Sequence, residues 1–264
     1  MVNAQDRTTF AELIRHFDRE KPSLKHPDQL ILEIGKFFLG TPYVAGSLET
    51  KAGEHLIVNL REFDCVTFAE NMVALVRLVR SRQKSFEAFQ KFLQKIRYRQ
   101  GRLQGYSSRL LYFSDWIHDN QKKGIVRDVT AEIWGVPFRK TMNFMTTNPD
   151  SYPPLKNPEN LRRLKSIERT INKRPLFFVP RSTLSRVESQ IKNGDLIAIT
   201  TDTEGLDVQH VGLALRVRNR IHLLHASSTV GKVVLSKPTL YRYLMQSRAR
   251  SGIMVARVTM TLDA

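Results

Sequence analysis

The sequence predicts an α+β protein in which the helices come first and an antiparallel sheet comes last. Over much of residues 10–97, apolar residues recur every three or four positions, the pattern of helices with one buried face. From residue 193 onward, short apolar runs are separated by turn residues, which indicates strands joined by tight connections. A chain of 264 residues, 41% of them hydrophobic, can bury a substantial core, so we treat residues 1–264 as one domain.

Two helices are expected before residue 41. Thr9 is a suitable N-cap for the first helix, and Pro27 can open a second helix that Gly40 ends. A turn-rich connector follows at 41–47, and residues 56–60 read as a short strand.

A third helix begins at the corner Asp64-Cys65. With Asp64 as N-cap, Cys65 becomes the first helical residue, where free backbone N–H groups and the helix dipole favour a thiolate. It is the only cysteine, which excludes an internal disulfide. The other interpretation is a small apolar residue at the top of the buried helix face.

Residues from about 80 to 190 read as a largely helical or irregular insertion that shapes the substrate site. Ser85 can cap one amphipathic helix and Pro158 can open another; residues 105–118 read as a loop that leads into a short helix, and 140–154 as a loop. The sheet follows, with strands expected at 196–200, 207–217, 221–226, 232–235 and 252–260 and a short helix from Pro238.

Two of the seven histidines, His210 and His225, lie in apolar strands. A cysteine nucleophile needs a nearby base and a third group to orient that base, and these two residues could supply both. Because side chains alternate along a strand, His225 faces one side and His222 the other. The alternative, for either residue taken alone, is a core histidine with a hydrogen-bond partner. No three ligand-type residues converge at metal spacing, so no metal or other cofactor is expected.

The net charge of +17 predicts attraction to anionic partners. The basic residues are spread along the chain, without zinc-finger spacing or an aromatic RNA-binding signature, so specific nucleic-acid binding is not expected. No run approaches the roughly 20 apolar residues of a membrane span. The N-terminus as written does not read as a signal peptide, although such a segment could have been removed.

Four features together resemble the NlpC-type cell-wall peptidases, papain-like cysteine hydrolases of bacterial peptidoglycan. They are the turn Leu39-Gly-Thr-Pro-Tyr-Val-Ala-Gly, the Asp64-Cys65 corner, the strand His210-Val-Gly-Leu and the strand end Leu224-His225-Ala-Ser-Ser. The resemblance implies a papain-like fold, with the Cys helix in an N-terminal helical part, the histidines in the C-terminal sheet and the insertion between them.

Further segments resemble one amidase branch of that superfamily, whose members cleave between the lactyl group and L-alanine of 1,6-anhydro-muropeptides. These segments lie at 65–68, 106–117, 142–145 and 207–212, and the resemblance spans most of residues 30–260. One departure is the corner itself, which reads Asp-Cys-Val-Thr where Asp-Cys-Ser-Gly is usual. It argues against general endopeptidase activity more than against the nucleophile.

The resemblance implies that Cys65 is the nucleophile, that His210 holds it as a thiolate and that His225 orients His210. The Tyr43 hydroxyl would help to stabilise the oxyanion, and Asp64 would contact a substrate amine or act only as a cap. The expected substrate-binding residues are Tyr106, Ser108, Arg109, Asp115, Trp116, Asn143 and Asp207. For two of them a structural role is equally open, with Trp116 packing under the insertion and Asp115 capping a helix.

The sequence therefore predicts a cysteine amidase of peptidoglycan fragments, in the periplasm or cell envelope if a signal peptide was removed and otherwise in the cytoplasm. One alternative is an NlpC-type D-glutamyl endopeptidase with the same fold. Another is a non-catalytic basic protein that binds nucleic acid or an anionic wall polymer.

Overall fold

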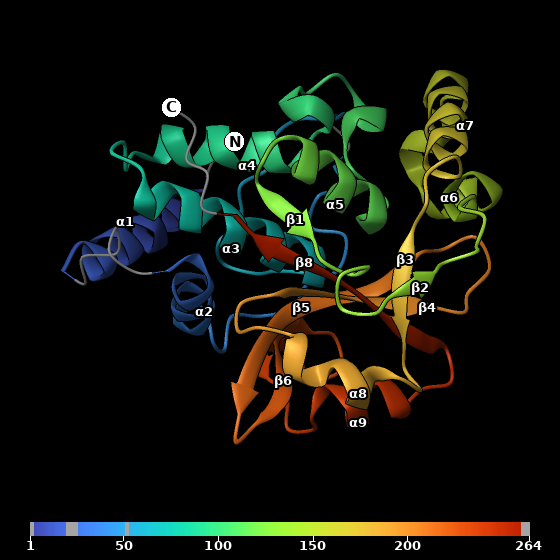
Figure 1. Cartoon of the computed structure of the whole chain (residues 1–264). Coiled ribbons are helices and arrows are strands. Elements are labelled where there is room, and N and C mark those ends of the chain that lie inside the picture. Colours follow the sequence, from blue (N-terminus) through green and yellow to red (C-terminus); the bar gives the residue numbers. More distant parts are fainter. Residues whose placement is uncertain (1–2, 20–25, 51–52, 260–264) are drawn as a thin grey trace.

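The computed structural model describes residues 3–19, 26–50 and 53–259 and has an antiparallel sheet between two unequal helical layers (Figure 1). The strand order is β2-β3-β8-β4-β5-β6-β7, and β1 also pairs with β8. The strands are β1 Val126–Asp128, β2 Val136–Pro137, β3 Phe177–Pro180, β4 Leu196–Thr201, β5 Val208–Val217, β6 Arg220–Ser227, β7 Lys232–Leu235 and β8 Arg250–Val258. The predicted α+β class is confirmed.

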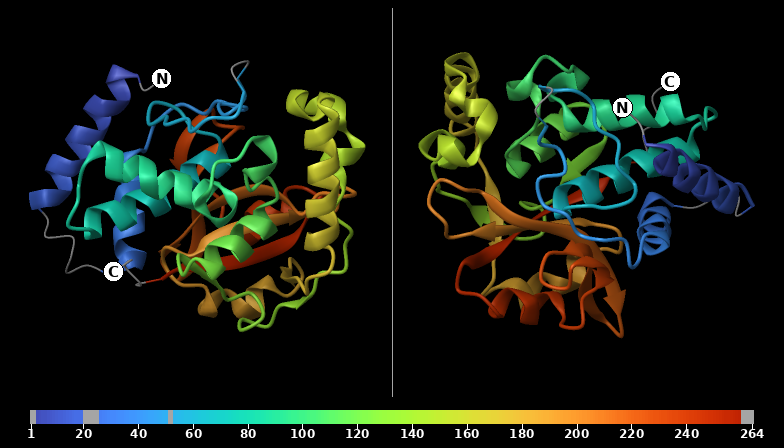
Figure 2. Two further views of the ribbon diagram at one scale, coloured as in Figure 1. Left: turned by 90° about the horizontal axis from the view of Figure 1, so that it is seen from above. Right: turned by 180° about the vertical axis from the view of Figure 1, so that it is seen from behind.

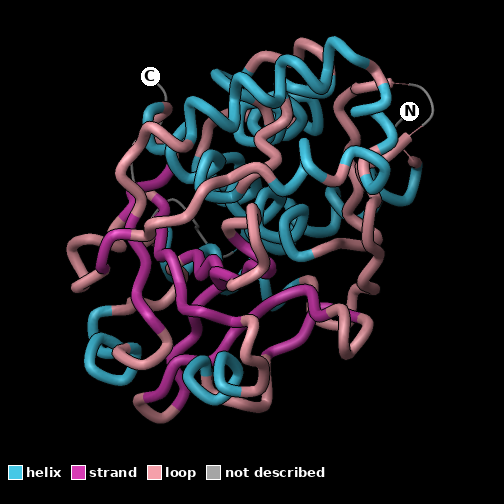
Figure 3. Tube along the Cα trace, turned by 90° about the vertical axis from the view of Figure 1, so that its right-hand side faces the viewer, coloured by secondary structure: helices cyan, strands magenta, loops and turns pink. Residues whose placement is uncertain are grey.

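The helices fall on both faces of the sheet. They are α1 Ala4–Arg19, α2 Pro27–Phe37, α3 Cys65–Arg80, α4 Phe86–Arg97, α5 Phe113–Lys122, α6 Phe144–Thr147, α7 Pro158–Ile171, α8 Leu184–Val187 and α9 Leu240–Met245. The long helices form one layer, in which α1 and α7 lie at opposite ends (Figure 2), and the short α8 and α9 lie beyond the strands (Figure 3). None of the helices in the described ranges is long and apolar enough to cross a membrane.

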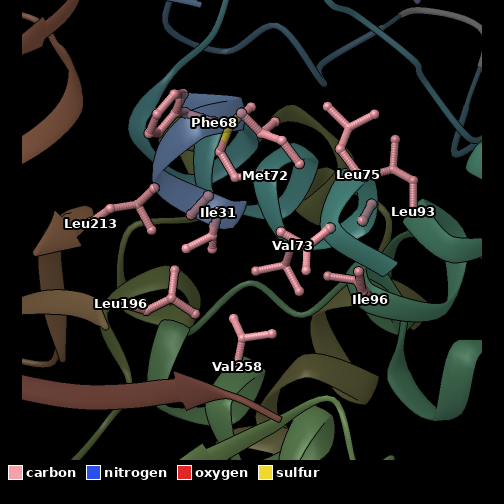
Figure 4. Packing of buried hydrophobic residues seen from close by; sticks show 14 of the residues in the cluster. Ile31, Phe68, Met72, Val73, Leu75, Leu93, Ile96, Leu196, Leu213 and Val258 are labelled. Carbon is pink, nitrogen blue, oxygen red and sulfur yellow. The ribbon is translucent and has the colours of Figure 1, made fainter. Parts of the chain in front are cut away.

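Helix α3 is the centre of the main core. Its residues Phe68, Met72 and Val73 are fully buried and pack among side chains of α2, α4 and the sheet (Figure 4). Alternation along β4 divides the sheet between two cores, since Leu196 faces the α3 side and Ile197 faces α8 and α9. The Cys helix is therefore held rigidly against the strands that carry the histidines.

Several predicted helix ends are confirmed. Ser85 caps α4 by accepting a hydrogen bond from the Ala88 N–H at 3.1 Å, and Pro158 opens α7. The cap predicted at Thr9 is wrong because α1 already begins at Ala4, where the Asn3 side chain accepts the Gln5 N–H at 2.9 Å.

The short strand predicted at residues 56–60 is also wrong. Side chains satisfy the backbone there in place of a neighbouring strand: the Asp6 carboxylate accepts the Leu60 N–H at 2.8 Å, and the Ile57 carbonyl accepts from Arg97 at 2.6 Å. An apolar run without a partner strand cannot form a ladder.

The segment 80–190 is partly built into the sheet. Strands β1 and β3 both pair with β8, and β2 pairs with β3. The remainder carries a third core, formed by Tyr106 and Tyr112 from the segment before α5 together with residues in and around α6 and α7. The C-terminal strand was expected to reach Met260, which lies outside the described residues; β8 ends at Val258.

Candidate active site

The corner before α3 fixes the position of Cys65. The Asp64 carboxylate accepts the Thr67 N–H at 2.7 Å, and the Thr67 hydroxyl oxygen accepts the Asp64 N–H at 2.9 Å, which makes a complete capping box. The predicted N-cap is therefore confirmed. Thr67 stands where the NlpC-type pattern has glycine, and its hydroxyl supplies the second half of the box.

His210 and His225 form a hydrogen-bonded pair on neighbouring strands. His210 Nε2 and His225 Nδ1 are 2.6 Å apart, and the rings are nearly perpendicular at 86°. The strand-parity prediction is confirmed, because His222 bonds through Nδ1 to the Ser236 carbonyl oxygen instead. With Nε2 engaged by His225, His210 keeps only Nδ1 for another partner.

Gly212 makes room for this pair. It lies on the same face of β5 as His210 and next to His225 on β6. A Cβ atom at position 212 would stand 2.9 Å from the Cβ of His225 and 3.3 Å from the Leu224 carbonyl oxygen. Glycine is therefore needed there for close approach of the two strands, without any unusual backbone angle.

The environment of Cys65 opposes ionisation in this ligand-free state. Burial and the negative charge of Asp64 raise the pKa of the Cys65 thiol to about 12, although the backbone N–H groups of Val211, Cys65 and Val66 act in the opposite direction. The expected resting thiolate is therefore wrong. The helix dipole is present, but the capping carboxylate that organises the helix end also repels a thiolate.

The two imidazoles are also neutral. Burial, the repulsion that a protonated His225 would exert and the positive charge of Arg250 lower the pKa of His210, and burial and Arg250 lower that of His225. No carboxylate contributes to either shift. The pair therefore differs from a triad with an acidic third member, which would stabilise the imidazolium.

Two tyrosines complete the surroundings of Cys65. Burial and the nearby Cys65 and Asp64 raise the pKa of Tyr43 to about 12, so its hydroxyl remains a hydrogen-bond donor at neutral pH. The ring of Tyr243, from α9, lies edge-on to His225 with centroids 5.5 Å apart, and the Arg250 guanidinium lies 4.0 Å above its centroid. Burial raises the pKa of Tyr243. The positive charge of Arg250 acts in the opposite direction, and the nearby Cys65 adds to the increase.

Three of the expected substrate-binding residues are buried and contact other parts of the protein, so their side chains are not exposed to a substrate. Trp116 is fully buried and stacks on Phe113 with centroids 4.9 Å apart, so as folded it offers no face to a sugar. The Asp115 carboxylate accepts hydrogen bonds from Arg99 and Arg174, each at 2.6 Å. It therefore links two segments of the chain and does not act as the helix cap that was the alternative. Asp207 accepts the Ser114 N–H at 2.7 Å and thereby caps α5.

The remaining expected residues do not share one pocket. Tyr106 and Arg109 line a pocket of about 660 Å³, in which Arg109 pairs with Glu49 and Glu54. Ser108 closes its own turn by donating to the Gly105 carbonyl at 2.6 Å. Asn143 lies at the start of α6, beside a different pocket of about 720 Å³. These seven residues therefore do not form one cluster.

Sequence reasoning missed Tyr243, Arg250 and the Val211 N–H. A tyrosine on a short helix and an arginine opening a strand have no distinguishing spacing, and a backbone donor is invisible to a search for side chains. Among the described residues, no group of three or more His, Cys, Asp or Glu side chains is arranged to hold a metal ion.

Comparison with known proteins defines the class of this protein. The model of the AmiA-like family, described as N-acetylmuramoyl-L-alanine amidase-like, matches residues 33–253. The chain belongs to this family. Comparison with curated proteins finds no match.

Several solved structures are similar to this chain, and they carry different descriptions. An N-acetylmuramoyl-L-alanine amidase from Bacteroides uniformis is similar at 39% identity and a TM-score of 0.84, over 88% of this chain and 99% of that one. A structure from Bacteroides fragilis described as a putative xylanase is similar at 40% identity and a TM-score of 0.81, over 86% of this chain and 100% of that one. A Legionella pneumophila protein, 23% identical with a TM-score of 0.72 over 96% of this chain and 94% of that one, shares the fold.

Proposed function

We propose that this protein is a cysteine amidase with an NlpC-type, papain-like site that hydrolyses the lactyl–L-alanine amide of peptidoglycan fragments, 1,6-anhydro-muropeptides in particular. The observation that carries the proposal is the 2.6 Å bond between His210 Nε2 and His225 Nδ1, next to a backbone N–H at Val211 that acts on Cys65. A nucleophile, a base and an orienting group thus come from three adjoining elements. Membership of the amidase-like family supports the bond type.

Because Cys65, His210 and His225 are all uncharged before substrate binds, the reaction begins with a proton transfer. For His210 Nδ1 to accept a proton, Nε2 must carry the hydrogen and donate it to His225 Nδ1. The Cys65 thiol then gives its proton to His210 Nδ1 as the sulfur bonds to the lactyl carbonyl carbon. Proton transfer accompanies attack because neither group is charged beforehand.

The remaining steps return each group to its starting state. The developing oxyanion would accept from the Cys65 N–H and the Tyr43 hydroxyl; losing one such donor costs about 3 kcal/mol of barrier. Protonated His210 gives its proton to the alanine nitrogen as the C–N bond breaks, leaving a thioester on Cys65. Water then loses a proton to His210 as its oxygen attacks the thioester carbon; the C–S bond breaks to leave the lactyl carboxyl group, and His210 returns the proton to the Cys65 sulfur.

The substrate specificity rests on the segments that resemble the anhydro-muropeptide branch. The pocket beside Tyr106 and Arg109 is the described cavity that contains two of these residues, and we assign it to part of the sugar or peptide. Trp116, Asp115 and Asp207 are buried and would support the helical part that carries this pocket, without touching the substrate. Since the substrate is peptidoglycan, we assign the activity to the cell envelope.

The test is digestion of purified anhydro- and reducing-end muropeptides, followed by mass spectrometry. The proposal predicts an intact free stem peptide from the anhydro form and no product with Cys65→Ala. A dipeptide left on the sugar would indicate the D-glutamyl endopeptidase instead. Equal inertness of wild type and Cys65→Ala on every fragment would favour a basic binding protein.

A further inference from the structure

A cavity of about 470 Å³ lies where α5, α7 and the 3₁₀ turn Arg99–Gly101 meet. None of Cys65, His210 and His225 lines it. In Figure 1, α5 and α7 both belong to the helical layer. We call this cavity the basic pocket, lined in part by Arg99, His118, Lys122, Lys123 and Arg174.

The basic pocket carries more positive than negative charge. Asp115 is shared by two guanidiniums, those of Arg99 and Arg174, each at 2.6 Å. Asp119 neutralises Lys123, with nitrogen and oxygen 2.6 Å apart. Lys122 is exposed and has no ion-pair partner in the described part of the chain. One guanidinium and one ammonium are therefore uncompensated.

Unused donors point to a ligand. Within the described residues, the Nε atom of Arg99 has no hydrogen-bond partner but is buried away from solvent, so the Arg99 donors that a ligand can reach are the terminal nitrogens. Arg99 and Arg174 each use one terminal nitrogen on Asp115 and retain other N–H groups. The positive charges of the pocket also act on His118. Burial lowers the pKa of His118, and the charges of Arg174 and Lys122 lower it further.

We propose that the basic pocket binds a phosphoryl group, carried on a small organic molecule as a phosphate monoester. Its donors come from three sides, namely the 3₁₀ turn, helix α5 and the end of α7, which suits a tetrahedral group better than a planar carboxylate. Its two uncompensated positive charges match a phosphate dianion. The cavity is much larger than a phosphate group alone, which leaves room for the organic part.

The test is binding, measured by NMR on protein labelled in its histidine rings, with His118→Gln used to assign the His118 signal. The probes are inorganic phosphate, glycerol phosphate and succinate. Glycerol phosphate should shift the His118 signal saturably with a Kd below about 1 mM. The apparent pKa of His118 should rise on binding, because a nearby dianion stabilises the imidazolium. Cys65→Ala should bind equally well, so the result is independent of the amidase proposal.

Charge-matched variants separate a site from general attraction. Lys122→Gln removes an exposed cation without an ion partner and should weaken binding about tenfold, as should Arg174→Gln if it folds. Arg127→Gln removes an equal charge from an exposed pair with Glu132 and should leave binding unchanged.

The outcomes decide the proposal as follows. Tighter binding of glycerol phosphate than of inorganic phosphate supports a monoester, while equal binding overturns the organic part. Succinate binding as tight as glycerol phosphate would overturn the phosphoryl assignment. Absence of a saturable shift up to about 10 mM, or equal weakening by Lys122→Gln and Arg127→Gln, would overturn the site.

Discussion

The histidine pair should make the protein progressively less stable as pH falls below neutrality. Burial and the neighbouring Arg250 charge lower the pKa of His210 to about 3 and that of His225 to about 4. In the unfolded chain both titrate near 6.5. A group whose pKa is lowered by folding adds stability that is complete above its unfolded pKa and is lost as pH falls toward its folded pKa.

The size of the effect follows from the protons taken up on unfolding. At about pH 5 the unfolded chain carries a proton on each histidine and the folded pair carries none. Each proton changes the free energy of unfolding by about 1.4 kcal/mol per pH unit, so the pair contributes about 2.7 kcal/mol per unit between about pH 6 and 4.5. Raised carboxyl pKa values, such as those of Glu70 and Asp207, act in the opposite direction.

A variant isolates the histidine contribution from these other groups. Urea unfolding, followed by the fluorescence of the buried Trp116, would be measured at several pH values between 7 and 4.5 for wild type and His225→Gln. The variant should lose about 1.4 kcal/mol per pH unit of slope. His16→Gln removes a histidine from the exposed side of α1 and should retain the wild-type slope. Equal slopes for wild type and His225→Gln would refute the reasoning.

Two further substitutions test the support of α3 and the space around the histidines. Glu70→Gln should cost about 3–5 kcal/mol in urea unfolding, because it leaves Arg97 charged with both side chains only 2% exposed, whereas Glu132→Gln, in an exposed pair, should cost less than about 1 kcal/mol. Equal losses would contradict that view. Gly212→Ala should displace His225 and lower kcat about 10- to 100-fold on muropeptides with little change in KM; unchanged kcat would show that the close contact is not needed.

The sequence predicts local features of this fold well where one residue determines the geometry. Asp64 and Ser85 accept hydrogen bonds from their helix ends as expected. The turn between β5 and β6 has φ values of +46° at Arg218 and +65° at Asn219, which explains a tight hairpin at that point. Strand alternation correctly separated His225 from His222, and the structure has His225 bonded to His210 while His222 bonds to Ser236.

Features that depend on tertiary burial were beyond local reasoning. The pattern that resembles a substrate-binding segment does not reveal that Trp116 is fully buried or that Asp115 joins two arginines. The prediction that Cys65 rests as a thiolate was wrong for the same reason. A helix N-terminus favours a thiolate, but burial and the adjacent Asp64 outweigh it, and their magnitude is set by packing.

The most direct test of the proposed mechanism is rapid acid quenching of the reaction with an anhydro-muropeptide, followed by intact-protein and peptide mass spectrometry. The account predicts an adduct on Cys65 with the mass of the sugar and its lactyl acyl group and without any amino acid. His210→Asn should abolish it. An adduct that also contains the first two stem residues would place cleavage after D-glutamate, and turnover without any adduct on Cys65 would contradict the thioester mechanism.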